Sequence, residues 1–232
     1  MRLARGDEII LCDTGGYDAR VRITALAKKE MQGDVLSREK NTAEPKRYIA
    51  LYCSVLKKEN FELVVQKAVE AGVYEIVPLK TKRTVKTGIS EDRLKKIAKE
   101  AAEQSGRARI PDIRARISFS EAISIILSEV MSSRVPSRDP DDIYDTRRDS
   151  SARGLGMTKN ILFDGTGEDA IHFFQKIRKD ARINIFIGPE GGWDAEELKE
   201  TQENGFTVLS LGPRTLRAET AAAIGTFLAV SL

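Results

Sequence analysis

Helix-like and strand-like patterns alternate along most of this chain, and this alternation constrains its fold more than any other feature. Apolar residues recur at helical spacing from Phe61 to Val69, just before Gly72, which is a typical helix stop. A second helix is predicted to begin at Ser90, with two acidic residues in its first turn. The other expected elements are strands at 75–79, 113–119, 160–163, 183–187 and 207–210, and helices at 121–130, 168–179, 194–204 and 218–229. Such alternation is typical of an α/β domain with a mostly parallel sheet.

Two segments depart from this alternation. Residues 3–55 have the composition of strands and turns, which favours a small β-barrel. Residues 132–158 hold two prolines, mixed charges and almost no apolar side chain, so burial cannot offset the entropy of ordering them. Because the α/β alternation resumes afterwards, we interpret 132–158 as a flexible insertion. We therefore expect two domains, residues 1–46 and residues 47–232.

Composition narrows the class of protein. Hydrophobic residues make up 41% and charged residues 31% of the 232, as in ordinary globular proteins, and the net charge of +3 does not by itself indicate nucleic-acid binding. No run approaches the roughly 20 apolar residues of a membrane span, and the first residues lack the apolar core of a signal peptide, so we expect a cytoplasmic protein without a membrane partner. Cys12 and Cys53 are expected to be inert buried thiols, and His172 has no Cys or His neighbour, so no metal site is predicted.

The first loop that could carry chemistry follows the expected strand 183–187. It reads Gly188-Pro189-Glu190-Gly191-Gly192-Trp193. Glycines beyond a strand let the backbone approach a ligand in the crevice where α/β folds bind one. The loop lacks the lysine of a phosphate-binding loop, and a tight turn without function is an equally good interpretation of it alone. Asp194 and Glu197 predict a capping box for the next helix.

A second loop, Leu211-Gly212-Pro213-Arg214-Thr215-Leu216-Arg217, leads into an apolar helix that carries Glu219 in its first turn. Glu219 is favoured there by the helix dipole, whereas Arg217 opposes it. A local rule broken in this way tends to mark a functional position.

These two loops, read together, resemble the RsmE family, bacterial enzymes that methylate N3 of a uridine in 16S rRNA and belong to the SPOUT class. The matching segments are Ile187–Trp193 and Leu209–Ala222. The resemblance continues upstream in Phe61–Gly72 and in Ala101–Arg107, in the order and approximate spacing of the family.

The resemblance implies more than patterning can. It implies a SPOUT-type parallel sheet with a C-terminal trefoil knot, a PUA-like N-terminal barrel, a homodimer, and S-adenosylmethionine as cofactor. The family begins with a short stretch before the segment that corresponds to 1–7 here, so we expect an N-terminally shortened barrel. The cofactor-binding residues that it implies are Gly188, Glu190, Gly191, Gly192, Leu211, Gly212 and Leu216.

Catalytic and RNA-binding roles follow from the same resemblance. Arg217 is the candidate for stabilising the uracil anion through charge-assisted hydrogen bonds. Glu219 either accepts the proton or orients Arg217, and both remain open. The candidates for RNA contact are Gln104, Arg107, Lys82 and Arg83, although a basic run is often only a solvated face.

Three other functions remain open at this stage. The chain could be a SPOUT protein that binds RNA without catalysis, or a related SPOUT methyltransferase acting on transfer RNA. It could also bind a nucleotide phosphate at Gly188, against which the missing lysine counts. The expected partner is the small ribosomal subunit with its 16S rRNA.

Overall fold

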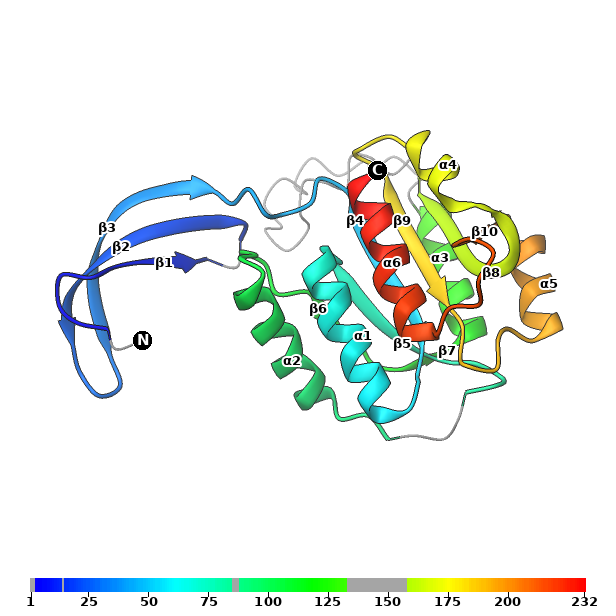
Figure 1. The fold of residues 1–232 in the computed structure, drawn as a ribbon, viewed down its shortest axis with the longest axis horizontal. Helices are drawn as coiled ribbons and strands as arrows, with labels where there is room; N and C mark the ends of the chain where they lie inside the picture. The colour runs from blue at the N-terminus through cyan, green and yellow to red at the C-terminus, as the bar shows by residue number, and fades with distance from the viewer. Residues whose placement is uncertain (1–2, 14, 85–87, 133–157) are drawn as a thin grey trace.

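The computed structural model describes residues 3–13, 15–84, 88–132 and 158–232. They form a three-stranded antiparallel sheet and, beside it, a larger parallel sheet covered by helices (Figure 1). The predicted α/β class with a mostly parallel sheet is confirmed. Nearly all of the insertion predicted at 132–158 lies outside the described residues.

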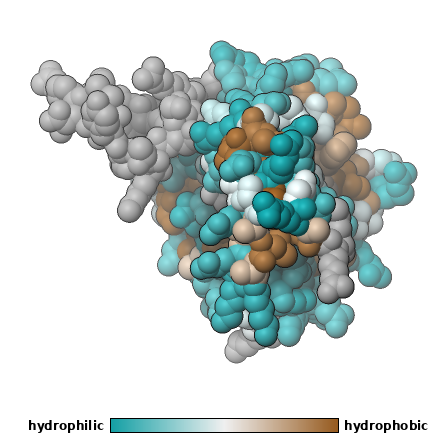
Figure 2. Space-filling view, turned by 90° about the vertical axis from the view of Figure 1, so that its left-hand side faces the viewer, coloured by the Kyte–Doolittle hydropathy of each residue, from teal (hydrophilic) through white to brown (hydrophobic). Residues whose placement is uncertain are grey.

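The N-terminal sheet consists of β1 (Glu8–Cys12), β2 (Tyr17–Leu26) and β3 (Met31–Lys40), in that spatial order. Where a barrel was expected, the described strands form an open sheet. Val21 and Ile23 are buried, whereas Ile10 and Val35 are each 65% exposed. Figure 2, which views this end of the molecule, shows small apolar groups scattered among hydrophilic ones. Cys12 is exposed rather than buried, which corrects our expectation for that thiol.

The large sheet has the strand order β10-β8-β9-β4-β5-β6, and β7 also pairs with β5. Every pairing in it is parallel, so all the carboxyl ends of its strands lie at one edge. The strands are β4 (Tyr48–Ser54), β5 (Glu75–Lys80), β6 (Asp112–Ile113), β7 (Ile117–Ser118), β8 (Lys159–Asp169), β9 (Arg182–Ile187) and β10 (Thr207–Ser210).

Helices cover both faces of this sheet, as the two apolar clusters show. One cluster joins alternate residues of β4, such as Leu51, to helices α1 (Lys58–Ala71), α2 (Glu91–Gln104), α4 (Ala170–Gln175) and α6 (Ala218–Ser231). The other joins the intervening residues, such as Tyr52, to α3 (Phe119–Ser132) and α5 (Ala195–Glu203). The strands are apolar on both faces for this reason. No helix in the described part of the chain is long and apolar enough to cross a membrane.

Two predicted elements were wrong in extent. The strand expected at 113–119 is two short strands, and Phe119 already belongs to α3, whose Glu121 carboxylate accepts from the Ser118 backbone N–H at 2.7 Å. The helix expected at 168–179 is α4 alone, because residues 168 and 169 pair with β10. The Asp169 side chain then caps the helix by accepting from the His172 backbone N–H at 2.7 Å.

Buried polar contacts hold the segment between the two sheets, residues 41–47. The Asn41 amide donates to the Gly106 carbonyl oxygen at 3.0 Å. The buried guanidinium of Arg47 donates to the carbonyl oxygens of Arg178, Ile177 and Ala229 at 3.1, 2.6 and 2.8 Å. These bonds attach this segment to the C-terminal helix and to the turn after α4. The domain boundary between 46 and 47 stays a prediction.

Candidate active site

The two glycine loops lie at the carboxyl edge of the parallel sheet. One follows β9 and the other follows β10, and β8 separates these strands. In Figure 1 the arrowhead of β9 and the first turn of α6 lie at this same edge. Ligands of parallel α/β folds bind outside the carboxyl ends of the strands, so the fold places the two loops where a cofactor site is expected.

Trp193 fixes the first loop against the sheet. Its indole N–H donates to the Phe163 carbonyl oxygen of β8 at 3.0 Å, and the ring is buried. A Cβ added at Gly188 would lie 3.0 Å from a carbon of this ring, so the backbone passes directly over the indole. Within the loop, the Gly192 N–H closes a turn onto the Pro189 carbonyl oxygen at 2.9 Å, and Gly192 has a φ of 69°. Both glycines therefore have a steric reason to be there.

The capping box predicted at the start of α5 is confirmed. The Asp194 carboxylate accepts from the Glu196 N–H at 3.1 Å, and the Glu197 carboxylate accepts from the Asp194 N–H at 3.0 Å. The backbone hydrogen bond from Glu196, with help from the nearby Lys82, lowers the pKa of Asp194 below 3.8. The loop and the helix that follows it are therefore one rigid unit.

The second loop contains a glycine in the left-handed region of backbone conformation. Gly212 has a φ of 107°, and a Cβ added there would meet no described atom within 4 Å. The Ser210 hydroxyl bonds both polar backbone groups of Gly212, donating to its oxygen at 3.1 Å and accepting from its nitrogen at 3.3 Å. Leu211 and Leu216 are half-buried. The Ser210 hydroxyl thus fixes the backbone at Gly212, and half-buried leucines lie on both sides of this glycine in the sequence.

Arg217 and Glu219 differ sharply in exposure. The Arg217 side chain is 84% exposed and the Glu219 side chain 10%, and Nη1 of the arginine lies 3.9 Å from Oε1 of the glutamate. The other oxygen of Glu219, Oε2, is buried with no hydrogen-bond partner in the described part of the chain. Burial raises the pKa of the Cys53 thiol at the end of β4, and the negative charges of Glu190 and Glu219 raise it further.

This arrangement fits S-adenosylmethionine, the cofactor implied by the resemblance. The cofactor carries a sulfonium and an ammonium group, which the carboxylates of Glu190 and Glu219 complement. The Glu219 oxygen without a hydrogen-bond partner in the described structure is the observation that favours a ligand here. Within the described ranges, no three His, Cys, Asp or Glu side chains are grouped as metal ligands.

Arg107 lies inside the protein, unlike a residue that contacts RNA. Its side chain is 3% exposed and forms an ion pair with Glu44, with 3.0 Å between Nη2 of the arginine and Oε2 of the glutamate. It also donates to the carbonyl oxygens of Val69 and Val73 at 3.1 and 2.7 Å. These internal acceptors hold the guanidinium at the carboxyl end of α1, so in this conformation it cannot reach a phosphate.

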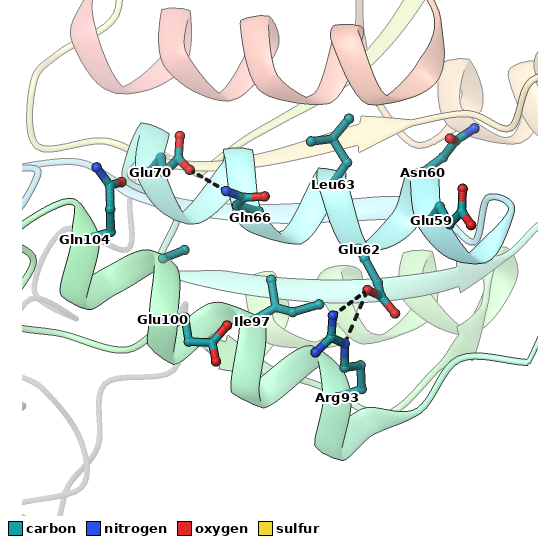
Figure 3. A pocket seen from close by; sticks show the side chains of 11 residues that line it. Glu59, Asn60, Glu62, Leu63, Gln66, Glu70, Arg93, Ile97, Glu100 and Gln104 are labelled. Atoms are coloured by element: carbon teal, nitrogen blue, oxygen red, sulfur yellow. Dashed lines mark hydrogen bonds and ion pairs between the residues drawn. The ribbon is translucent and has the colours of Figure 1, made fainter.

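Gln104 is exposed but lies far from the glycine loops. It lines a groove between α1 and α2, at the same end as Glu70 (Figure 3). Glu62, whose carboxylate accepts from Arg93 at 3.2 Å, lies further towards the amino end of α1. Because α1 begins at the carboxyl edge of the sheet, the structure does not bring Gln104 to the candidate site.

Lys82 and Arg83 do lie at the site, but their partners are protein groups. Lys82 pairs with Glu196 and Asp194 at the start of α5, and hydrogen bonding to Glu196 raises its pKa. The Arg83 guanidinium donates to the Gly191 carbonyl oxygen at 3.0 Å. Sequence reasoning missed this connection, because nothing local to a basic run shows which carbonyl it will bond.

A parallel α/β sheet with two glycine loops at its carboxyl edge, and a buried carboxylate in the first turn of the last helix, can hold an organic cofactor outside the ends of its strands. The RNA methyltransferase domain family matches this chain over residues 43–229. Two relatives are both named ribosomal RNA small subunit methyltransferase E. The protein from Bacillus subtilis is 27% identical over 95% of this chain and 80% of its own length. The protein from Mesomycoplasma hyopneumoniae is 29% identical over 89% of this chain and 79% of its own length.

Two solved structures extend the comparison. The ribosomal RNA small subunit methyltransferase E of Neisseria gonorrhoeae, bound to S-adenosylmethionine, has a TM-score of 0.75, 25% identity, and coverage of 97% of this chain and 83% of that one. A methyltransferase from Legionella pneumophila, also with bound S-adenosylmethionine, has a TM-score of 0.71, 27% identity, and coverage of 99% and 84%. The chain belongs to the RsmE family of RNA methyltransferases.

Proposed function

We propose that this protein transfers the methyl group of S-adenosylmethionine to N3 of a uridine in the 16S rRNA of the small ribosomal subunit. Family membership and the names of the relatives support the RNA substrate. The single observation that carries the reaction is the buried Glu219 oxygen in the first turn of α6, which has no hydrogen-bond partner among the described residues. The S-adenosylmethionine bound in two related structures supports this choice of cofactor.

The cofactor supplies an electrophilic methyl group, and the protein supplies alignment. The backbone of Leu211, Gly212 and Leu216, together with the turn at Gly191 and Gly192, holds the cofactor on the carboxyl edge of the sheet. An in-line displacement gains rate when its reacting atoms are held in order. Rigid loops on a packed sheet provide that order, because Trp193 and the α5 capping box fix the first loop.

Arg217 then stabilises the target base. Its exposed guanidinium, at the first turn of α6, donates to a uracil oxygen as N3 gives its proton to solvent water. Of the two roles considered for Glu219, we favour orientation of Arg217, because the two charged groups lie 3.9 Å apart. Replacing Glu219 by Gln keeps the shape and removes the base. A pH profile of kcat whose shape is unchanged in this variant supports orientation, whereas loss of the rise on its acid side supports proton transfer.

The deciding experiment uses small ribosomal subunits that lack the modification. The protein is incubated with them and methyl-labelled S-adenosylmethionine, and the digested RNA is analysed for labelled nucleosides. Label in 3-methyluridine supports the proposal. Label that appears only in transfer RNA favours the related substrate instead, and cofactor binding without label in either RNA favours a non-catalytic RNA-binding protein.

We also propose a homodimer. Helix α6 exposes Ile224 and Phe227, at 40% and 58%, and the neighbouring α1 exposes Leu63 at 40%. A second copy would cover this apolar face beside Arg217. Sedimentation of the Phe227→Asp variant tests this: a shift from dimer to monomer is the expected result, and an unchanged mass contradicts it.

The finer expectations from the resemblance remain part of the proposal. They are the C-terminal trefoil knot, the domain boundary between 46 and 47, and action in the cytoplasm, where small ribosomal subunits are assembled. The exposed Gln104 stays a candidate RNA contact. Gln104 is the last residue of α2, and it would meet RNA where α2 ends, on the side of the N-terminal sheet (Figure 1).

A further inference from the structure

The loop after β5 contacts the first glycine loop through Arg83. Its Nη1 donates to the Gly191 carbonyl oxygen at 3.0 Å, and its Nη2 lies 3.6 Å from Oδ2 of Asp194. The aliphatic part of the side chain also covers Gly191, since a Cβ added at that glycine would lie 3.6 Å from two of its carbons. One side chain therefore spans the turn, from its apex to the first residue of the α5 cap.

A buried hydroxyl cluster anchors the loop that carries Arg83. The hydroxyls of Ser54, Thr81 and Thr84 lie 2.8 to 3.2 Å from one another, at the carboxyl ends of β4 and β5. The Thr84 hydroxyl also accepts from the Thr81 N–H at 2.8 Å. The Lys82 N–H donates to the buried Glu197 carboxylate at 2.9 Å. Arg83 thus projects from a backbone that is fixed at both the sheet and α5.

The turn that Arg83 contacts needs such an external restraint. Gly191 and Gly192 have no side chains to limit their backbone angles, and Gly192 already has a φ of 69°. The hydrogen bond from Gly192 to Pro189 closes the turn but leaves the direction of the Gly191 carbonyl group to other contacts. An arginine fixes a carbonyl better than a lysine, because its planar group offers several donors in one geometry.

We propose that Arg83 is a positioning residue for the cofactor, which holds the turn at 190–192 in its binding conformation, and is not a phosphate contact. This inference rests on the proposed function, because it assumes that the turn binds S-adenosylmethionine. Removal of Arg83 then weakens cofactor binding, while RNA binding and its dependence on salt stay as in the wild type.

The test compares three full-length variants: Arg83→Met, which keeps the aliphatic stem, Arg83→Lys, which keeps the charge, and Lys82→Met. The last is a matched control, because it removes the same charge from the same loop without touching Gly191. S-adenosylmethionine affinity is measured by fluorescence of Trp193, the one tryptophan in the sequence, and by calorimetry. RNA affinity is measured at several salt concentrations, and thermal unfolding shows that each variant is folded.

We expect Arg83→Met to bind S-adenosylmethionine at least about tenfold more weakly, equivalent to about 1.4 kcal/mol. The KM for the cofactor should rise more than kcat falls. Lys82→Met should keep its cofactor affinity within about twofold, and Arg83→Lys should fall between the two. Normal cofactor affinity in Arg83→Met, with a salt slope reduced by about one, would make it a phosphate contact and overturn the proposal. A wild-type protein that does not bind S-adenosylmethionine would instead refute the proposed function, and this inference with it.

Discussion

Gly212→Ala should lower both the free energy of unfolding and the affinity for S-adenosylmethionine, and a control variant can separate the two effects. The φ of 107° costs any residue with a Cβ about 1–3 kcal/mol, whether or not a ligand is present. The added Cβ meets no described atom within 4 Å, so no steric term adds to this cost in the free protein. In the complex the same methyl group would occupy space assigned to the cofactor, and overpacking costs about another 1–3 kcal/mol. Affinity for S-adenosylmethionine should therefore fall about 5- to 150-fold.

Gly16→Ala is the matched control for this prediction. Gly16 has a φ of 95° and equally open surroundings among the described residues, but it lies in the turn before β2 of the N-terminal sheet. Both variants should lose a similar amount of unfolding free energy, with a fall in Tm of about 2–4 °C per kcal/mol for a chain of this size. Calorimetric titration should then show weakened cofactor binding in Gly212→Ala alone. Equal cofactor affinity in the two variants would refute the assignment of this turn to the site.

Three further predictions follow from buried and charged groups. Arg107→Met should lower the free energy of unfolding in urea by about 3–5 kcal/mol, because it leaves the Glu44 carboxylate unpaired, and it should not change the salt dependence of RNA binding. Iodoacetamide should modify Cys12 in the native protein and reach Cys53 only after unfolding, because Cys12 is exposed and Cys53 is fully buried; peptide mass spectrometry distinguishes the two. Asp194 contributes to stability because its pKa is lower in the folded protein than in the unfolded chain. This contribution is present above pH 3.8, the ordinary carboxyl pKa, and is lost as the pH falls through the native pKa. An acid titration of Trp193 fluorescence should therefore show a step that Asp194→Asn lacks.

Much of the fold could be predicted because its signals are local. The apolar spacing before Gly72, the cap at Ser90 and the capping box at Asp194 each depend on residues within one helical turn, and the structure confirms all three. The helix expected at 168–179 failed for the opposite reason. Its first two residues pair with β10, a strand some 40 residues later, and no local pattern shows that pairing.

In the candidate site, too, the features with local sequence signals could be predicted and those that depend on distant residues could not. The glycine loops and Glu219 could be identified from motifs, since their chemistry depends on backbone shape and on one carboxylate. The environment of Arg107 could not, because Glu44 lies 63 residues earlier in the sequence. Cys12 was expected to be buried because it lies in an apolar run, but β1 has no described layer covering it.

Three of the residues predicted to contact RNA contact groups of the protein instead, so other cations must bind the RNA. Each of these cations contacts a carboxylate or a carbonyl oxygen of the protein itself: Lys82, Arg83 and Arg107. Counterion release, which sets the salt dependence of RNA affinity, counts cations that neutralise phosphates. Two other exposed cations, Arg214 and Arg217, lie on the loop after β10 that also contains Gly212. Substrate and cofactor would then be bound by one loop. A change there should alter both affinities, whereas replacement of Arg83 in the loop after β5 should alter that of the cofactor alone.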